Sequence, residues 1–191
     1  MTDTEALRPD TATEDVIEVL LHQHEMVKST FAEVLSAPPA WRQEPFDRLR
    51  ALLAMHETAE EMVLRPRTRS IGAEDVAEMR NSEEKAATEV LAELEKMGPE
   101  DARFLELLTQ LHQDVLTHAA AEEAMEFPRI RMEVPLDERE AMGRRLLVVE
   151  KTGPTHPHTS TAGSTGRSWV LGPFASMVDH VRDAFSTGDD R

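Results

Sequence analysis

Two segments of the chain repeat one spacing, a histidine followed four residues later by a glutamate. The pairs are His56 with Glu60, and His118 with Glu122. Residues at positions i and i+4 lie on one face of an α-helix, so each pair directs an imidazole and a carboxylate the same way. Steps of three and four residues place both pairs on apolar stripes, formed by Leu49, Leu52 and Val63 and by Leu108, Leu111, Val115 and Met125.

These stripes are the faces that a folded helix would bury. Burying a polar group without a partner costs roughly 2–7 kcal/mol, and burying a bare charge costs far more. Two histidines and two carboxylates on such faces therefore require partners that offset the cost of their burial. A bound metal ion is one explanation, and two buried, hydrogen-bonded His–Glu pairs are the structural alternative.

The composition narrows the classes of function. The 191 residues carry a formal net charge of −16, which argues against nucleic acids and anionic membranes as partners. Cysteine is absent, which excludes disulfides, thiolate metal sites and iron–sulfur clusters. The polar first ten residues show no signal peptide, and no apolar run approaches the ~18 residues of a membrane span. We expect a cytoplasmic protein.

The hydrophobic periodicity predicts an all-α fold. Helical stripes extend from about residue 13 to 36, 45 to 64, 73 to 97 and 99 to 127, and we find no useful alternating strand pattern. We expect the second and fourth helices to stop before Pro66 and near Pro128. Four helices of similar length joined by short connections favour an up-down-up-down four-helix bundle with additional C-terminal helices.

We divide the chain into three parts. Residues 1–12 are expected to form a flexible N-terminal arm and residues 13–134 the bundle. A C-terminal extension, 135–191, would hold two short helices separated by a loop rich in Ser, Thr, Pro and Gly. Because the last helix is amphipathic, we expect it to pack on the bundle or on a partner chain, which would make a homo-oligomer.

Each of the four bundle helices contributes polar residues to its apolar stripe near mid-helix. The candidate metal ligands are His24, His56, Glu60, Glu84 (or Glu83), His118 and Glu122. This sulfur-free set suits iron or manganese, with zinc as a further possibility. Six ligands are too many for one tetrahedral zinc and suit two metal ions, with the two His-x3-Glu carboxylates able to bridge them.

Three segments carry a resemblance to a known family. They are Leu20-Leu21-His22-Gln23-His24-Glu25, His56-Glu57-Thr58-Ala59-Glu60-Glu61, and His118-Ala119-Ala120-Ala121-Glu122-Glu123 followed by Phe127-Pro128. The chain resembles hemerythrin-like proteins of the HHE cation-binding type over about residues 13–130. The resemblance implies a centre of two non-haem iron ions, oxo- or hydroxo-bridged, in a four-helix bundle. It assigns the ligand role to His24, His56, Glu60, His118 and Glu122.

The third helix departs from that family pattern, because many relatives have a histidine where this chain reads Ser82-Glu83-Glu84-Lys85. Aligning the apolar residues that follow puts Glu84 in the histidine's place, although the stripe alone does not exclude Glu83. An added anionic ligand stabilises ferric over ferrous iron. We therefore expect a centre that reacts with O2, peroxide or nitric oxide, in the manner of an oxidoreductase, rather than a reversible O2 carrier. The alternatives are an iron or oxygen sensor or store without turnover and, more remotely, a zinc hydrolase.

Overall fold

The structure is a computed structural model that describes residues 15–150 and 174–188. Within these two ranges every regular element is helical, and none is a strand. The expected flexible arm and the Ser/Thr/Pro/Gly-rich loop lie outside the described residues. No described helix is long and apolar enough to cross a lipid bilayer.

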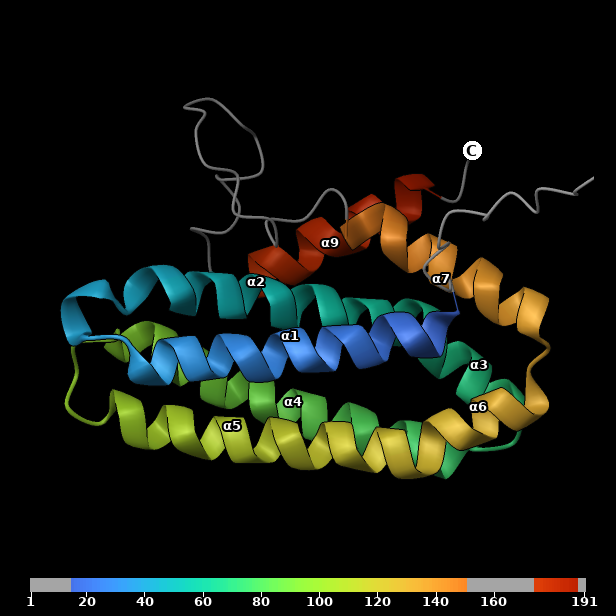
Figure 1. The fold of residues 1–191 in the computed structure, drawn as a ribbon, viewed down its shortest axis with the longest axis horizontal. Helices are drawn as coiled ribbons and strands as arrows, with labels where there is room; N and C mark the ends of the chain where they lie inside the picture. Colours follow the sequence, from blue (N-terminus) through green and yellow to red (C-terminus); the bar gives the residue numbers. More distant parts are fainter. Residues whose placement is uncertain (1–14, 151–173, 189–191) are drawn as a thin grey trace, which may run out of the picture.

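Four long helices form the predicted bundle. They are α1 (Val16–Ser36), α2 (Gln43–Ala59), α4 (Glu74–Met97) and α5 (Phe104–Ala121). Figure 1 shows them side by side, with α1 and α4 running in one direction and α2 and α5 in the other. The all-α, up-down-up-down architecture is therefore confirmed.

The local sequence explains how these helices start and pack. The side chain of Asp15 caps α1 by accepting a hydrogen bond from the backbone N–H of Ile17 at 2.9 Å. A short 3-10 turn, η1 (Pro39–Trp41), joins α1 to α2. At the same end of the bundle, Phe46 and Phe104 are buried and meet edge to face with ring centroids 5.0 Å apart.

Both helices that carry a His-x3-Glu pair continue past their prolines, which corrects the predicted helix ends. After α2 the chain forms a π-helical segment, η2 (Glu60–Leu64), and then α3 (Arg65–Ser70). After α5 it forms η3 (Glu122–Glu126), also π-helical, and then α6 (Phe127–Glu133). Each wider π turn ends two residues before the proline and so relieves the clash that would otherwise break the helix there.

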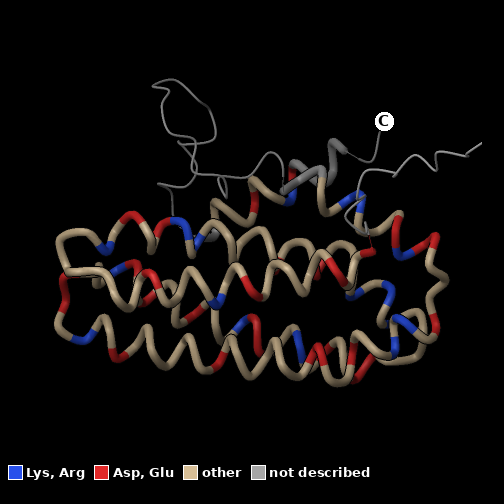
Figure 2. The backbone as a smooth tube through the Cα atoms, viewed as in Figure 1, with Lys and Arg blue, Asp and Glu red and all other residues tan. Residues whose placement is uncertain are grey.

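Two further helices cover the bundle beside α1 and α2. α7 (Leu136–Glu150) packs against α1, and α9 (Phe174–Gly188) lies along α2 and touches α7 (Figure 1). Met177 and Val181 of α9 are buried, and Val178 is partly buried. The last helix thus packs on its own bundle, and association with a second copy stays a prediction. Figure 2 shows acidic residues on every long helix, in keeping with the net charge.

Candidate metal centre

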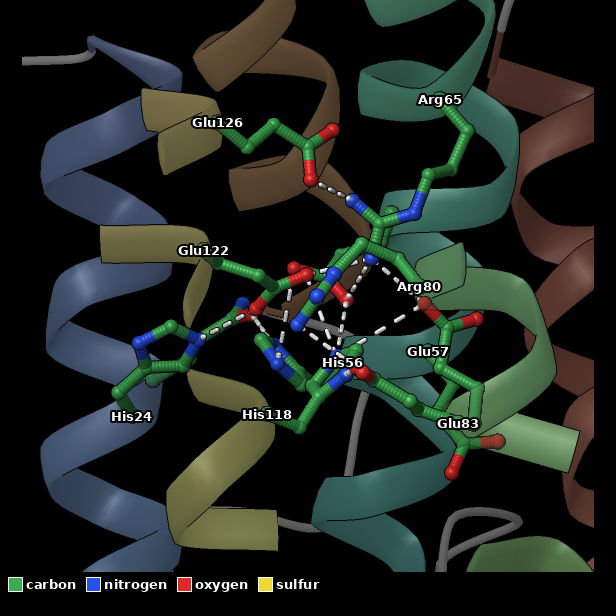
Figure 3. Close-up of polar contacts among 12 residues, drawn as sticks. His24, His56, Glu57, Arg65, Arg80, Glu83, His118, Glu122 and Glu126 are labelled. Atoms are coloured by element: carbon green, nitrogen blue, oxygen red, sulfur yellow. Dashed lines mark hydrogen bonds and ion pairs between the residues drawn. The ribbon is translucent and has the colours of Figure 1, made fainter. Parts of the chain in front are cut away.

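The six predicted ligands converge inside the bundle, where Figure 3 shows several of them from α1, α2 and α5 pointing toward one another. They form two groups of four whose ligand atoms lie within 4.8 Å of one another. The first group is His24, His56, Glu60 and Glu122, and the second is Glu60, Glu84, His118 and Glu122. Because Glu60 and Glu122 belong to both groups, the arrangement has the geometry of two adjoining subsites with two shared carboxylates.

The first group, which we call the His24 subsite, is buried throughout. His24 Nε2 lies 3.3 Å from Glu122 Oε2, and His56 Nε2 lies 3.7 Å from Glu60 Oε1. The rings of His24 and His56 meet nearly edge to face, with centroids 5.0 Å apart. The His24 ring also stacks on Phe127, at 5.7 Å between centroids. Two imidazoles and two carboxylate oxygens therefore face one small volume.

The second group, the Glu84 subsite, is built from one imidazole and three carboxylates. His118 Nε2 lies 3.2 Å from Glu122 Oε1 and 3.9 Å from both Glu60 Oε2 and Glu84 Oε1. Each shared carboxylate thus directs one oxygen to each subsite. That is the disposition a bridging carboxylate requires.

A hydrogen bond at Nδ1 orients each of the three imidazoles. The acceptors are Glu123 for His24 at 2.8 Å, Gln23 for His56 at 3.1 Å and Glu83 for His118 at 2.8 Å. Such contacts leave Nε2 of every ring directed at the shared carboxylates, as in metal-binding histidines generally. These contacts also distinguish Glu83 from Glu84, which the sequence alone left as alternative ligands. Glu84 belongs to the second group, whereas Glu83 accepts the hydrogen bond from Nδ1 of His118.

Sequence reasoning missed Arg65, whose side chain is fully buried at the Glu84 subsite (Figure 3). Its Nη2 lies 2.6 Å from Glu84 Oε1, 2.5 Å from Glu122 Oε1 and 3.2 Å from Glu60 Oε2. These are the same three oxygens that face His118 Nε2. Its Nη1 lies 2.7 Å from Glu126 Oε2.

A repeat in the sequence could have pointed to Arg65. Both pairs extend to His-x3-Glu-x5-Pro, ending at Pro66 and Pro128, and the residue before each proline is Arg65 in one copy and Phe127 in the other. In each π segment the backbone N–H of that residue donates to the carbonyl of the ligand glutamate five residues earlier. The two side chains consequently occupy equivalent places, one beside Glu84 and the other beside His24.

Arg80 is a second missed residue. It is buried, and its Nη1 lies 2.7 Å from Glu83 Oε2. The same oxygen accepts the hydrogen bond from His118 Nδ1, so Glu83 joins a guanidinium to an imidazole. Glu83 itself is 39% exposed, which places it at the edge of the cluster.

Burial and the neighbouring carboxylates shift the pKa values of His24 and His118 in opposite directions. Burial alone would lower the pKa of His118, but the nearby carboxylates of Glu122 and Glu60 outweigh it and raise that pKa to about 11. The same balance, chiefly with Glu122, raises the pKa of His24 above its ordinary value. His56 differs because burial dominates and lowers its pKa, which favours the neutral form.

The carboxylates respond to their different neighbours. Burial and the charge of Glu60 raise the pKa of Glu84 to about 7, although Arg65 opposes this shift. Burial would also raise the pKa of Glu122, but the nearby imidazoles of His118 and His24 hold it well below its ordinary value. Glu122 is therefore more firmly ionised than Glu84.

Unsatisfied polar atoms test whether the cluster fits a cation. His24 Nε2, His118 Nε2, Glu60 Oε1 and Glu122 Oε2 are buried and have no hydrogen-bond partner among the described residues. Buried polar atoms rarely stay unpaired, and each such atom costs about 1–3 kcal/mol. All four belong to the two candidate subsites, and three of them face the His24 subsite. The donors present fit a hard or borderline cation.

The fold and this cluster define a class of protein, a helix bundle with an internal histidine–carboxylate cation centre. The chain matches the hemerythrin HHE cation binding domain over residues 15–130. It belongs to that family, and a metal-binding function follows from the membership.

Two curated relatives match the chain. An uncharacterised hemerythrin-like protein of Schizosaccharomyces pombe is 28% identical over 134 residues, 69% of this chain and 66% of that protein. A protein of Nostoc sp. named DNA nickase is 29% identical over 127 residues, 66% of this chain and 36% of that protein. The chain therefore spans just under two thirds of one relative and about a third of the other. No solved structure matches at the same level of significance.

Proposed function

We propose that this protein is a non-haem di-iron protein that binds and reacts with a small oxidant, namely O2, peroxide or nitric oxide. The observation that carries the proposal is the pair of subsites sharing Glu60 and Glu122. His24 and His56 would hold one iron, and Glu84 and His118 the other. A pair of irons in these subsites would supply the one-electron redox steps that reaction with an oxidant needs.

The protein's own residues contribute orientation and charge. Glu123, Gln23 and Glu83 fix the rings of His24, His56 and His118 through Nδ1, which keeps each Nε2 available as a ligand. Glu60, Glu84 and Glu122 add negative charge that favours ferric iron. Arg65 offsets part of that charge through the three carboxylate oxygens that face the Glu84 subsite.

Metal content provides the first test. We expect two irons per chain by elemental analysis, with near-ultraviolet absorption that disappears on reduction. One zinc per chain would overturn the proposal. Stopped-flow mixing of the reduced protein with O2 should show oxidation of the centre, whereas a stable and reversible O2 adduct would refute the reactive assignment.

A sensor or store without turnover is the second candidate, and one contact favours it. Arg182 of α9 lies 2.7 Å from the carboxylate of Glu61, which directly follows the proposed ligand Glu60. A change of charge at the centre could reach the C-terminal helix through this short path. If redox state alters the protease sensitivity of residues 152–191 and no oxidant is consumed catalytically, the sensor replaces the oxidoreductase.

A further inference from the structure

A cavity of about 450 Å³ lies between α1, α2, α4 and α5, and it includes the candidate metal centre, because five of the six candidate ligands line it. At its inner end it is lined by His24, His56 and His118. Gln110 and Asp114, which also line it, are exposed on α5. The cavity therefore leads from the protein surface to the candidate ligands.

The cavity is much larger than a small oxidant needs. A water molecule takes up about 30 Å³ in the liquid, so O2 or peroxide would fill only a small part of it. Pockets for organic ligands have volumes of about 300–1,000 Å³, and this volume falls in that range. Two metal ions and a small oxidant would fill only part of this volume, which leaves room for a larger ligand.

The walls of the cavity are mainly apolar and come from all four bundle helices. Val27 of α1, Leu53 of α2 and Val115 of α5 line it, and α4 contributes the small side chains of Ala87 and Val90. Apolar walls favour an apolar body, because burying apolar surface gains about 25 cal/mol per Å². The short side chains on α4 leave the space that a larger residue would fill.

The charges around the cavity select against an anion. Glu83 lines it at the edge of the cluster, and Asp114 lines it at an exposed position on α5. Lys28 also lines it, but its ammonium lies 2.8 Å from the carboxylate of Glu25. With a net charge of −16 on the whole chain, an anionic ligand would be repelled on approach.

We propose that this cavity binds a neutral, mostly apolar organic molecule and holds it against the metal centre. The ligand enters past the exposed face of α5 and lies between the apolar side chains of α4 and those of α2 and α5. Its role as the substrate that is oxidised rests on the proposed function, whereas its binding does not.

Binding can be measured with N-phenyl-1-naphthylamine, a neutral compound whose fluorescence rises when it leaves water. Titrated into the full-length protein as purified, it should give a saturable, one-site increase. Ala87→Phe should weaken this binding by about tenfold or more, because the ring fills the cavity. The matched control is Ala141→Leu, at an exposed position on α7 away from the cavity, and it should leave binding unchanged. Val90→Phe serves as a second filling variant if Ala87→Phe does not fold.

Two outcomes would overturn the proposal: no saturable binding to the unmodified protein, or binding unaffected by a folded filling variant. The choice of a neutral ligand has its own test, since 1-octanol should displace the dye about tenfold more effectively than octanoate. Equal displacement or a preference for octanoate would refute it. Metal content, measured in parallel, keeps the two ideas separate. Dye binding with no iron present would reject the di-iron function and retain the cavity, and iron without dye binding would do the reverse.

Discussion

The His24 and Glu84 subsites share two carboxylates yet differ in their remaining neighbours. In the first, the histidine from α1 stacks on an apolar ring, Phe127. In the second, the acid from α4 pairs with a guanidinium, Arg65, at 2.6 Å. Phe127 and Arg65 stand at the same position of the sequence repeat, five residues after Glu122 and Glu60.

The two subsites thus differ at two neighbouring positions that are related by the approximate symmetry of the centre. Where one subsite has the histidine His24 beside an apolar ring, the other has the acid Glu84 beside a guanidinium. A buried acid without a partner would be costly, and the guanidinium supplies the partner. The comparison teaches that the Glu84 subsite holds its own compensating cation, whereas the His24 subsite holds three of the four candidate ligand atoms that lack a hydrogen bond. We therefore expect the two subsites to bind metal unequally, with the His24 subsite filling first.

Removing a shared carboxylate should have the largest effect, because it would abolish both subsites together. Glu122→Gln keeps the shape of the side chain and removes the charge that both subsites use. We expect iron per chain to fall from two to nearly none by elemental analysis. Glu61→Gln is the matched control at an exposed position next to the other shared carboxylate, and it should retain both irons. Retention of one iron by Glu122→Gln would mean that the subsites are independent.

Arg65→Gln removes the guanidinium of the Glu84 subsite and should lower the stability of the metal-free protein. Losing one partner of a buried ion pair costs about 3–5 kcal/mol, because the remaining charge is left without compensation. Urea denaturation of protein stripped of metal should show this loss. Added iron should recover more of the stability of Arg65→Gln than of the unmodified protein, since the metal replaces the missing cation.

Arg67→Gln is the matched control for Arg65→Gln. Arg67 lies two residues further along the same helix and pairs with Glu138 at the surface, 2.9 Å away. A pair of this kind contributes at most about 1 kcal/mol. Equal losses in the two variants would show that burial of Arg65 among the ligands carries no special weight.

Replacing Arg65 by Phe and Glu84 by His together should make the two subsites alike. Arg65→Phe removes the guanidinium that pairs with Glu84, and Glu84→His removes one of the four carboxylates around Arg65, while the double variant copies the Phe127–His24 arrangement. We expect the double variant to be more stable than the sum of the single changes by about 0.5–3 kcal/mol, the range of coupling for residues in contact. A double-mutant cycle by urea denaturation measures this quantity. Strict additivity would show that the two positions do not compensate each other.

Much of the bundle and most of the cluster could be predicted because they depend on local periodicity. His56 with Glu60 and His118 with Glu122 need only the repeat of the helix to share a face, and His24 follows from the stripe of its own helix. The structure brings these residues together, and their role as ligands stays a prediction. The all-α fold followed from the same periodicity.

The remainder depends on contacts between distant parts of the chain. Glu83 and Glu84 are adjacent on a helix with a weak stripe, so only the positions of His118 and Arg65 separate their roles. Arg65 meets Glu122, which is 57 residues away in the sequence, and an arginine before a proline reads as the exposed end of a helix. The π turns that carry the helices past both prolines overrode the usual expectation that proline ends a helix.

The smallest expected effect concerns the groups that orient the imidazoles. The His56 ring is held by a neutral amide, Gln23, and the His118 ring by a carboxylate, Glu83. An anion at Nδ1 makes the ring a stronger ligand, because it stabilises positive charge on the imidazole. Glu83→Gln would copy the Gln23 arrangement and should weaken the second metal-binding step by about tenfold while leaving the first unchanged.

Stepwise iron titration of stripped protein would separate these two binding steps. The reciprocal variant, Gln23→Glu, should strengthen the first step and leave the second unaltered. If Glu83→Gln weakens both steps alike, the change acts through the fold, for example by freeing Arg80 from its ion pair, and not through the ring of His118. If Glu83→Gln weakens only the second step, the two subsites also differ in the hydrogen bonds that orient their histidines.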